Sequence, residues 1–582
     1  MGLPRAIKAH AENLLVEAEI HYRRAYDQGK ANEVLFQNFG ALLKKIGKTD
    51  EACVIFEEGL KKYPNHAGIK RNYANQLRKN RPLYAIEMYI SAIYSTLLAP
   101  IQTDLFFSCC DDLVETLREQ NFLQWSRLLI ATLLSSQTPS PVVLKNLLLI
   151  FDRLDVSDES KSAVLSAIEL QKDAVSLMDA VSLDFALASH YLSQTQHQRS
   201  LCHFEDGIAR VNSAPSIDKV DQFALQELID SNSWNFACAL LPLNQFDRGW
   251  KLFDHGLRTP ADGHQKWQRA LLKPFSADEL PPWRGQTFQN QRLLLLEEQG
   301  IGDCMMFLTL IPALLAETKF IGLFISPRLV SIYKRSFSED ISSGKISIYT
   351  KHDLPNNRLK SSNYDAQIPL GSICQYRFTS IDSYAPRVPI LLADPLLSKQ
   401  LRLEYMKTKP SAKRLVGVSW RGGGRGIRIK QKSIDVDLFA KLMLQHPDIC
   451  FVDLQYGETK EQIDNWKELG VDIIHDRRID PLKDMNRWLA QVNACDAVVS
   501  VANTTIHGAG GLNIPTQCLL STYSDWRWFV NPEVKRSYWY PSVGIARESS
   551  DPDVAWSDAY QVVSDWLHSG CPMPLGPTHV PV

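Results

Sequence analysis

The sequence lacks paired cysteines and any large excess of charge. Its 11 cysteines form no CxxC pair and follow no regular spacing, and the neighbours Cys109 and Cys110 cannot easily share an unstrained bridge. We therefore expect neither a disulfide framework nor a zinc site. The formal net charge is -1, from 64 basic and 65 acidic residues, which removes the overall electrostatic footprint of a nucleic-acid-binding protein.

Long apolar runs are also missing. No stretch approaches the roughly 18 consecutive apolar residues that a membrane span requires, and the longest, around Leu128 to Leu134 and Leu293 to Leu296, have the length of core segments. Near the start, Lys8, Glu12 and Glu17 interrupt the apolar residues that a signal peptide would need. The sequence predicts a cytoplasmic protein without a membrane span.

The composition is that of an ordinary globular protein, with 45% apolar and 22% charged residues. A chain of 582 residues exceeds what one hydrophobic core usually covers. We therefore expect three or four domains.

The first hundred residues contain a repeated pattern. A small–aromatic–small triplet at i, i+4 and i+7 recurs after 34 and 33 residues, as Ala18, Tyr22 and Ala25, then Ala52, Phe56 and Gly59, then Ala85, Tyr89 and Ala92. Small residues let paired helices approach closely, and aromatic residues fill the space between neighbouring repeats. The pattern resembles tetratricopeptide repeats, although ordinary amphipathic helices show a related periodicity.

A similar unit returns later in the chain. From about 100 to 230 the spacing is helical without a repeat register, and near Trp234 the triplet reappears as Gly249, Phe253 and Gly256. We interpret this unit as the terminal repeat that caps the helical array.

After residue 275 the pattern changes to short apolar runs between helical segments. These runs are RLLLLE, KFIGLFI, KISIYT, LVGVSW, ICFVDL, VDII, AVVSV and TQCLL. Runs of this length are typical of buried parallel strands, so the alternation predicts an α/β architecture. The charged stretch from Pro386 to Lys413 looks like a seam between two such domains, with the boundary near 400.

Three strand ends carry polar or glycine-rich turns. After RLLLLE, Gly300 and Gly302 permit a tight turn, and Asp303 is expected at the start of the next helix, either as a cap or as a site residue. After the strand that ends at Trp420, Gly422 belongs to a loop of glycines and basic residues that also contains Arg421, Gly423, Gly424, Arg425, Gly426, Arg428, Lys430 and Lys432. Such a loop can cradle phosphate oxygens, and the alternative is a solvated basic loop.

The third turn follows AVVSV. Asn503, Thr504 and Thr505 offer donors at a helix start, where the macrodipole favours an anion such as a diphosphate, and His507 follows in the first turn. A packing or capping role for His507 is the alternative. In the later SDWRWF, we expect the tryptophans to fill the core.

Taken in order, these motifs resemble bacterial tetratricopeptide-repeat glycosyltransferases whose catalytic half is similar to glycosyltransferase family nine, the heptosyltransferase-like group. The likeness covers roughly Trp234 to Leu567 and includes PPWRGQ, EEQGIGD, VSWRGG, FVDLQYG, DPLKDMNRWLAQVNACDAVVSVANTTIHGAGGL and DWRWF. It implies a GT-B fold, in which two Rossmann-like domains face a cleft, a nucleotide-sugar donor held by the C-terminal domain, no cofactor and no required metal.

The resemblance also implies roles for single residues. Asp303 matches the aspartate proposed as general base toward the acceptor hydroxyl, since that hydroxyl must lose its proton. Arg421, Arg428 and Lys432 lie in the phosphate-binding loop, where basic groups stabilise the departing nucleoside diphosphate.

Further residues match the donor side of the family's site. Thr504, Thr505 and His507 match the helix start that holds the diphosphate, and Gln455 ends the strand whose loop covers the nucleoside. Related sequences usually carry aspartate where this chain has Asn503, so we assign Asn503 to binding alone.

These expectations define five regions. They are tetratricopeptide-like repeats over 1–110, a helical region over 111–230, a terminal repeat-like unit and linker over 231–275, an acceptor-side GT-B domain over 276–400 and a nucleotide-sugar-binding domain over 401–582.

The sequence therefore predicts a glycosyltransferase that uses a nucleotide sugar and a protein acceptor held by the repeats, with flagellin as the best single guess. A lipopolysaccharide or other glycan acceptor is the enzymatic alternative. A catalytically decayed repeat scaffold or chaperone is the second alternative, and the repeats argue against a GT-B epimerase.

Overall fold

The structure is a computed structural model, and it describes most of the chain. The described residues are 2–12, 14–29, 31–97, 158–214, 216–257, 273–285, 291–356, 358–384, 389–423, 431–528, 534–551 and 553–574, with isolated positions between 105 and 148 and at 269, 287, 289 and 429. The chain forms two compact units: residues 1–190 with 203–216, and residues 191–202 with 217–582.

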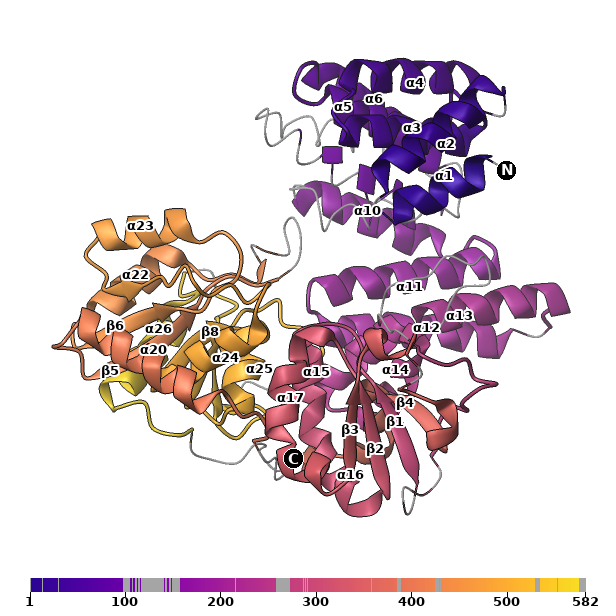
Figure 1. Cartoon of the computed structure of the whole chain (residues 1–582). Coiled ribbons are helices and arrows are strands. Elements are labelled where there is room, and N and C mark those ends of the chain that lie inside the picture. Colours follow the sequence, from indigo (N-terminus) through magenta and orange to yellow (C-terminus); the bar gives the residue numbers. More distant parts are fainter. Residues whose placement is uncertain are drawn as a thin grey trace. The chain divides into compact units, whose positions relative to one another are not determined.

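The first unit begins with three pairs of helices (Figure 1). They are α1 (Gly2–Ala11), α2 (Leu15–Asp27), α3 (Glu33–Lys45), α4 (Thr49–Lys62), α5 (Ala67–Leu77) and α6 (Pro82–Leu97). The repeated triplets lie on α2, α4 and α6, and all nine of their side chains or glycine positions are buried. A Cβ added at Gly40 would lie 2.3 Å from Cε1 of Phe56, so the small residue allows α3 and α4 to touch. The tetratricopeptide-like pairing is confirmed.

The next described helices also pair. They are α10 (Asp158–Gln171), α11 (Leu177–Ser193) and α12 (His197–Ser213). Gly207 of α12 packs on Phe185 of α11, with a hypothetical Cβ 2.7 Å from Cε1 of that ring. Nε of Arg210 donates to the buried Asp184 at 2.7 Å. Most of the segment 98–157, for which we expected helices, lies outside the described residues.

In the second unit, α13 (Lys219–Leu240) and α14 (Phe246–Phe253) form a further helix pair where we predicted a terminal repeat. Gly249 approaches Leu241, and Gly256 approaches Trp234, where added Cβ atoms would lie 2.7 and 2.4 Å from side-chain atoms. Phe253 is fully buried. The same small-residue contacts that join the first helix pairs therefore join this pair.

The first sheet of the second unit is entirely parallel. Its strands are β1 (Arg292–Leu296), β2 (Phe320–Phe324), β3 (Ile346–Tyr349) and β4 (Ala366–Pro369), in the order β3-β2-β1-β4. The helices of this region are α15 (Ile301–Phe307), α16 (Ile311–Glu317), α17 (Val330–Ser336), α18 (Ser338–Ser342) and α19 (Cys374–Arg377).

The second sheet is parallel as well. Its strands are β5 (Arg414–Ser419), β6 (Ile449–Asp453), β7 (Ile473–Ile474), β8 (Ala497–Val501), β9 (Thr516–Leu520) and β10 (Val543–Arg547), in the order β10-β9-β8-β5-β6-β7. The helices are α20 (Pro395–Thr408), α22 (Val436–Leu444), α23 (Lys460–Glu468), α24 (Met485–Ala494), α25 (Thr504–Gly511) and α26 (Ser557–His568). This is the strand order of a Rossmann domain, and the first sheet reproduces four strands of it.

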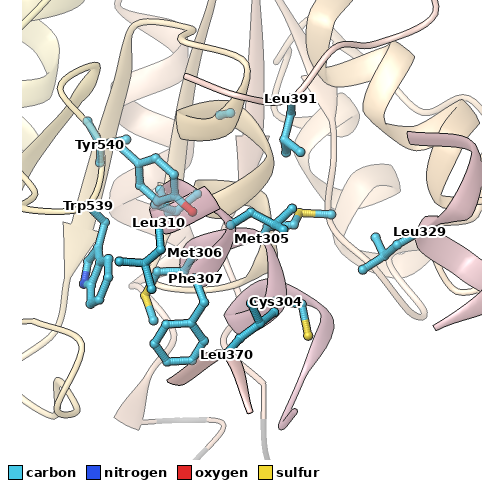
Figure 2. Packing of buried hydrophobic residues seen from close by; sticks show 14 of the residues in the cluster. Cys304, Met305, Met306, Phe307, Leu310, Leu329, Leu370, Leu391, Trp539 and Tyr540 are labelled. Carbon is cyan, nitrogen blue, oxygen red and sulfur yellow. The ribbon is translucent and has the colours of Figure 1, made fainter. Parts of the chain in front are cut away.

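One hydrophobic core joins α13 and α14 to the first sheet and to one face of the second. Figure 2 shows part of it, where Phe307 of α15 lies near Trp539, with ring centroids 5.9 Å apart. The other face of the second sheet has its own core, which includes Trp420 and Trp466. Among the described residues, no helix has the length and apolar character needed to cross a bilayer.

Candidate functional site

The chemistry-bearing turns lie where each sheet reverses its strand order. In the second sheet, β5 and β8 are neighbours, and the residues that follow them are Trp420 and Ala502. In the first sheet, β1 and β4 are neighbours, and β1 leads to the turn before α15. Open α/β sheets bind ligands at such switch points, beyond the carboxyl ends of the strands.

The conformation of the turn after β1 is set by a backbone angle and by one hydrogen bond. Gln299 has a positive φ of 58°, and the N–H of Gly300, the N-cap of α15, donates to Oδ2 of Asp303 at 3.1 Å. The capping role that the sequence left open for Asp303 is therefore present in the structure. It uses only one of the two carboxylate oxygens.

The other oxygen of Asp303 meets an arginine from the second sheet's domain. Nε of Arg527 donates to Oδ1 of Asp303 at 2.5 Å, and Nη2 of Arg527 donates to Gln299 at 3.2 Å. Arg527 also pairs with Asp525 at 3.0 Å, and Asp525 pairs with Lys432 at 3.0 Å. Asp303 and Lys432, which belong to the two domains that we expected to face a cleft, are thus linked by a chain of ion pairs.

Burial and charge compete within this chain. Burial opposes the charged form of Asp525, but Arg527 and Lys432 outweigh it and hold the pKa of Asp525 well below its usual range. Burial would lower the pKa of Arg527, but Asp303 and Asp525 raise it above the usual value. Both groups are therefore charged, and each depends on its partners because an unpaired buried charge is costly.

Gly302 brings the helix starts of the two sheets together. A Cβ added at Gly302 would lie 2.8 Å from Cδ2 of His507 and 3.5 Å from both Cα and Oγ1 of Thr504. Asp303 is therefore close to the first turn of α25. Within the described residues, neither the N–H nor the hydroxyl of Thr504 has a hydrogen-bond partner, so both can receive an anion.

The hydrogen bonds of Asn503 explain why an asparagine occupies this position. Its Oδ1 accepts from the N–H of Thr505 at 2.9 Å, which caps α25. Its Nδ2 donates to Oγ of Ser419 at 2.7 Å and to the carbonyl oxygen of Arg421 at 3.1 Å. An aspartate at this position could cap the helix but could not donate to a carbonyl. The amide therefore ties β8 to the end of β5.

Gln455, which follows β6, also binds the residues at the end of β5. Its Oε1 accepts from the hydroxyl of Ser419 at 2.9 Å and from the N–H groups of Trp420 and Arg421 at 3.1 and 2.9 Å. Trp420 packs on Trp466, with ring centroids 4.6 Å apart. The hydrogen bonds of Gln455 and the packing of Trp420 therefore stabilise the start of the turn after β5.

The basic loop after β5 is described only in part. Arg421 donates to the carbonyl oxygen of Tyr456 at 3.1 Å. A Cβ added at Gly422 would lie 2.4 Å from Cβ of Lys432, so only glycine permits this crossing of the loop. Arg428 lies outside the described residues.

His507 is buried on the side of α25 that faces α15. Its Nδ1 lies 3.2 Å from the hydroxyl of Tyr540. Burial lowers the pKa of His507 to about 4, although Asp303 acts in the opposite direction. The ring is therefore neutral near pH 7. Thr505 is also buried, at 1% exposed, so among the predicted diphosphate contacts Thr504 is the more accessible threonine.

Sequence reasoning gave only a core role to part of the segment Ser521–Trp528, which we name the junction loop. Trp526 packs on Trp250 and Phe253 of α14 and on Phe307 of α15, with centroids 5.8, 5.0 and 6.2 Å apart. The core role expected for the tryptophans is confirmed for Trp526, but the charged residues beside it were not singled out. An arginine between two buried tryptophans, with an aspartate directly before them, was the available signal, because buried charges must be paired.

Space beside the junction loop is small in this structure. A hollow of about 10 Å³ is lined by the loop, by Lys432, and by Leu519 and Leu520 of β9. Among the described residues, no group of three or more His, Cys, Asp or Glu side chains could hold a metal ion.

The architecture as a whole is a helical region of paired helices followed by two parallel α/β sheets with Rossmann strand order. It is the arrangement that the resemblance to repeat-bearing GT-B glycosyltransferases implies. The candidate residues Asp303, Thr504 and His507 lie where α15 and α25 meet.

Comparison with known proteins gives distant likenesses. No protein-family profile matches the chain. Protein FlbA of Caulobacter vibrioides is 25% identical over 316 residues, which cover 53% of this chain and 50% of FlbA. The chain therefore spans about half the length of the curated relative it matches.

Solved structures resemble parts of the chain. They include a glycosyl transferase family 9 protein from Veillonella parvula (10% identity, 49% of this chain and 98% of that one, TM-score 0.33) and the E. coli ADP-heptose lps heptosyltransferase II (14%, 48% and 98%, TM-score 0.32). An O-GlcNAc transferase of Thermobaculum terrenum is 11% identical over 84% of this chain and 82% of its own, with a TM-score of 0.25. Because each TM-score is below 0.5, any assignment of function rests on this chain's own residues.

Proposed function

We propose that this protein is a glycosyltransferase that moves a sugar from a nucleotide-sugar donor to an acceptor hydroxyl, without a required metal. The observation that carries the proposal is the meeting of α15 and α25, where a buried carboxylate, Asp303, lies beside the open helix start at Thr504. Sugar transfer from a nucleoside diphosphate needs a base for the acceptor hydroxyl and, close to it, a site that binds the leaving diphosphate.

In the proposed reaction, Asp303 takes the proton of the acceptor hydroxyl. A carboxylate has about four lone-pair sites, and the bonds from Gly300 and Arg527 occupy two of them, so Asp303 retains the capacity to accept a third. The acceptor oxygen then bonds to the anomeric carbon, and the bond from that carbon to the diphosphate oxygen breaks.

The leaving diphosphate carries the negative charge that the site must stabilise. The N–H and hydroxyl of Thr504 and the start of α25 are placed to receive it, and Lys432 and Arg527 supply positive charge nearby. Arg421 and Arg428 belong to the same loop by sequence, and in our proposal they add to this field.

The acceptor in our proposal is a protein, with flagellin as the best single guess. The paired helices provide an extended surface of the kind that binds peptides. A lipopolysaccharide or other glycan acceptor is the competing assignment, and a transfer assay separates the two.

The experiment incubates the full chain with a panel of nucleotide sugars and with flagellin, a glycan acceptor or neither. Mass spectrometry of the acceptor measures transfer. We expect one donor to modify flagellin, and Asp303→Asn to lower the rate on the order of 10²-fold or more. The matched control is Asp365→Asn. It removes a carboxylate that lies away from the site and pairs with Arg292 at 2.7 Å, and it should retain activity.

A binding scaffold is the second candidate, because both oxygens of Asp303 are already engaged. A scaffold would give no transfer with any donor while the protein remains folded. That result would reject the transferase proposal in favour of the scaffold.

A further inference from the structure

The helical part of the second unit holds a hollow outside the site described above. It has a volume of about 310 Å³ and is lined by the turn between α11 and α12 and by Leu243. The lining residues there are Thr195 and Gln196, which precede α12, and His197, Gln198 and Arg199 in its first turn. Its size is at the lower end of the range for small-molecule sites.

The hollow lies at the first turn of α12, a helix of 17 residues. Within the part of the chain that the structure describes, the N–H groups of His197, Gln198 and Arg199 make no hydrogen bond, as is usual for the first turn of a helix. The first turn also contains no acidic side chain. Its positive dipole end is therefore uncompensated by the helix itself.

His197 gives an independent sign of a ligand. The side chain is only 4% exposed and lines the hollow, yet neither Nδ1 nor Nε2 has a hydrogen-bond partner in the described structure. A buried polar group left without partners costs about 1 to 3 kcal/mol, so such groups are rare unless a ligand or ion completes them. Burial lowers the pKa of His197 to about 4, with Asp525 acting in the opposite direction.

Arg199, which also lines the hollow, adds a positive charge. Its Nη1 donates to Oε1 of Gln196 at 2.9 Å, and its guanidinium lies 5.6 Å from the centre of the Tyr191 ring. These contacts use part of its five donors and hold the group beside the helix start.

We propose that the first turn of α12, together with His197 and Arg199, is a binding site for a phosphoryl group. The site offers several hydrogen-bond donors: three backbone N–H groups, an imidazole and a guanidinium. This is more than the roughly four acceptor positions of a carboxylate can use, and it suits the three strong acceptor oxygens of a phosphate. The volume has room for a diphosphate, free or within a nucleotide. This site goes beyond the proposed transferase function and does not depend on it.

The chain supplies its own comparison in α14. There Gln245 precedes the helix, and Nη1 of Arg248 donates to Oε1 of Gln245 at 2.9 Å, the same contact as in α12. In α14 one of the two residues between them is Asp247, whose negative charge compensates the helix start. Arg248→Gln is therefore a matched control for Arg199→Gln.

The experiment titrates the full chain with inorganic pyrophosphate in a calorimeter, and then with a nucleoside diphosphate. We expect Arg199→Gln and His197→Leu each to remove, or weaken about tenfold, a binding component that Arg248→Gln retains. A nucleoside diphosphate that competes for this component would show that the phosphoryl group belongs to a nucleotide; a failure to compete would show that free pyrophosphate is the ligand.

Thermal unfolding separates binding from folding. Leucine at position 197 removes an unpartnered buried polar group, so His197→Leu should leave Tm unchanged or raise it. If the Tm of His197→Leu falls, pyrophosphate binding by the exposed-site variant Arg199→Gln provides the test instead. Unchanged pyrophosphate binding in Arg199→Gln, or an equal loss in Arg248→Gln, would overturn the proposal. An absence of sugar transfer would count against the transferase function and leave this result unaffected.

Discussion

Nε of Arg527 lies 2.5 Å from Oδ1 of Asp303, although 224 residues separate the two in the chain. The pair joins α15, the helix that follows β1, to the loop that follows β9. Because both side chains are mostly buried, each neutralises a charge that would otherwise be costly. The candidate base Asp303 and the cation Arg527 therefore form one largely buried ion pair.

Removing this cation should destabilise the protein. Arg527→Gln leaves Asp303 and Asp525 without their shared partner, and we expect a loss of about 3 to 5 kcal/mol in the free energy of unfolding, measured by urea denaturation. In a double-mutant cycle, Asp303→Asn should reduce the loss because one of the two carboxylates is then neutral. Purely additive effects would contradict the coupling.

Asn503 should resist replacement by aspartate. Asn503→Asp removes the donor to the carbonyl oxygen of Arg421 and places a negative charge against it, so we expect a loss of about 1 to 3 kcal/mol in unfolding free energy. The control is Asn465→Asp on the exposed face of α23, which should change stability by less than about 0.5 kcal/mol. Equal effects of the two would refute the hydrogen-bonding role.

Gly302 should be sensitive to a single methyl group. Gly302→Ala places Cβ 2.8 Å from His507, which requires α15 and α25 to move apart, and we expect a loss of about 1 to 3 kcal/mol together with lower transfer activity. Gly300→Ala meets only Oδ2 of Asp303, at 3.3 Å, and should cost less. Melting temperatures of both variants test the difference, and a larger cost at Gly300 would argue against the close helix contact.

Stability should fall in mild acid because of His507. The unfolded imidazole has a pKa near the ordinary 6.5, and burial lowers it to about 4 in the folded state, so the unfolded state binds a proton first as the pH falls. The stabilisation is fully present above about pH 6.5 and is lost progressively down to about pH 4, with a total of about 3 kcal/mol.

His507→Gln should remove much of that slope, whereas His352→Gln on the exposed surface should leave it unchanged. Unfolding free energies measured between pH 7 and pH 4.5 provide the test. An equally steep decline in His507→Gln would show that other groups cause the acid sensitivity.

The strands show where sequence patterns succeed. All eight apolar runs that we interpreted as strands form strands, because buried parallel strands need uninterrupted apolar residues. The strands β4 (AQIP) and β10 (VGIAR) escaped notice, since a glutamine, a proline, a glycine and an arginine interrupt their apolar character. Gln367 of β4 is buried and donates to the carbonyl oxygen of Leu280 at 2.7 Å, which no local pattern announces.

The sequence by itself determined the helical pairs, the parallel strands and the turns that hold Asp303 and Asn503, because these depend on local spacing and on residue types within one element. Only the tertiary structure decided that Asp303 pairs with Arg527, that Asn503 and Gln455 shape the turn after β5, and that His197 is buried without partners. Those relations join segments far apart in the chain, and a long-range contact depends on how packed elements meet, which spacing along a sequence does not encode.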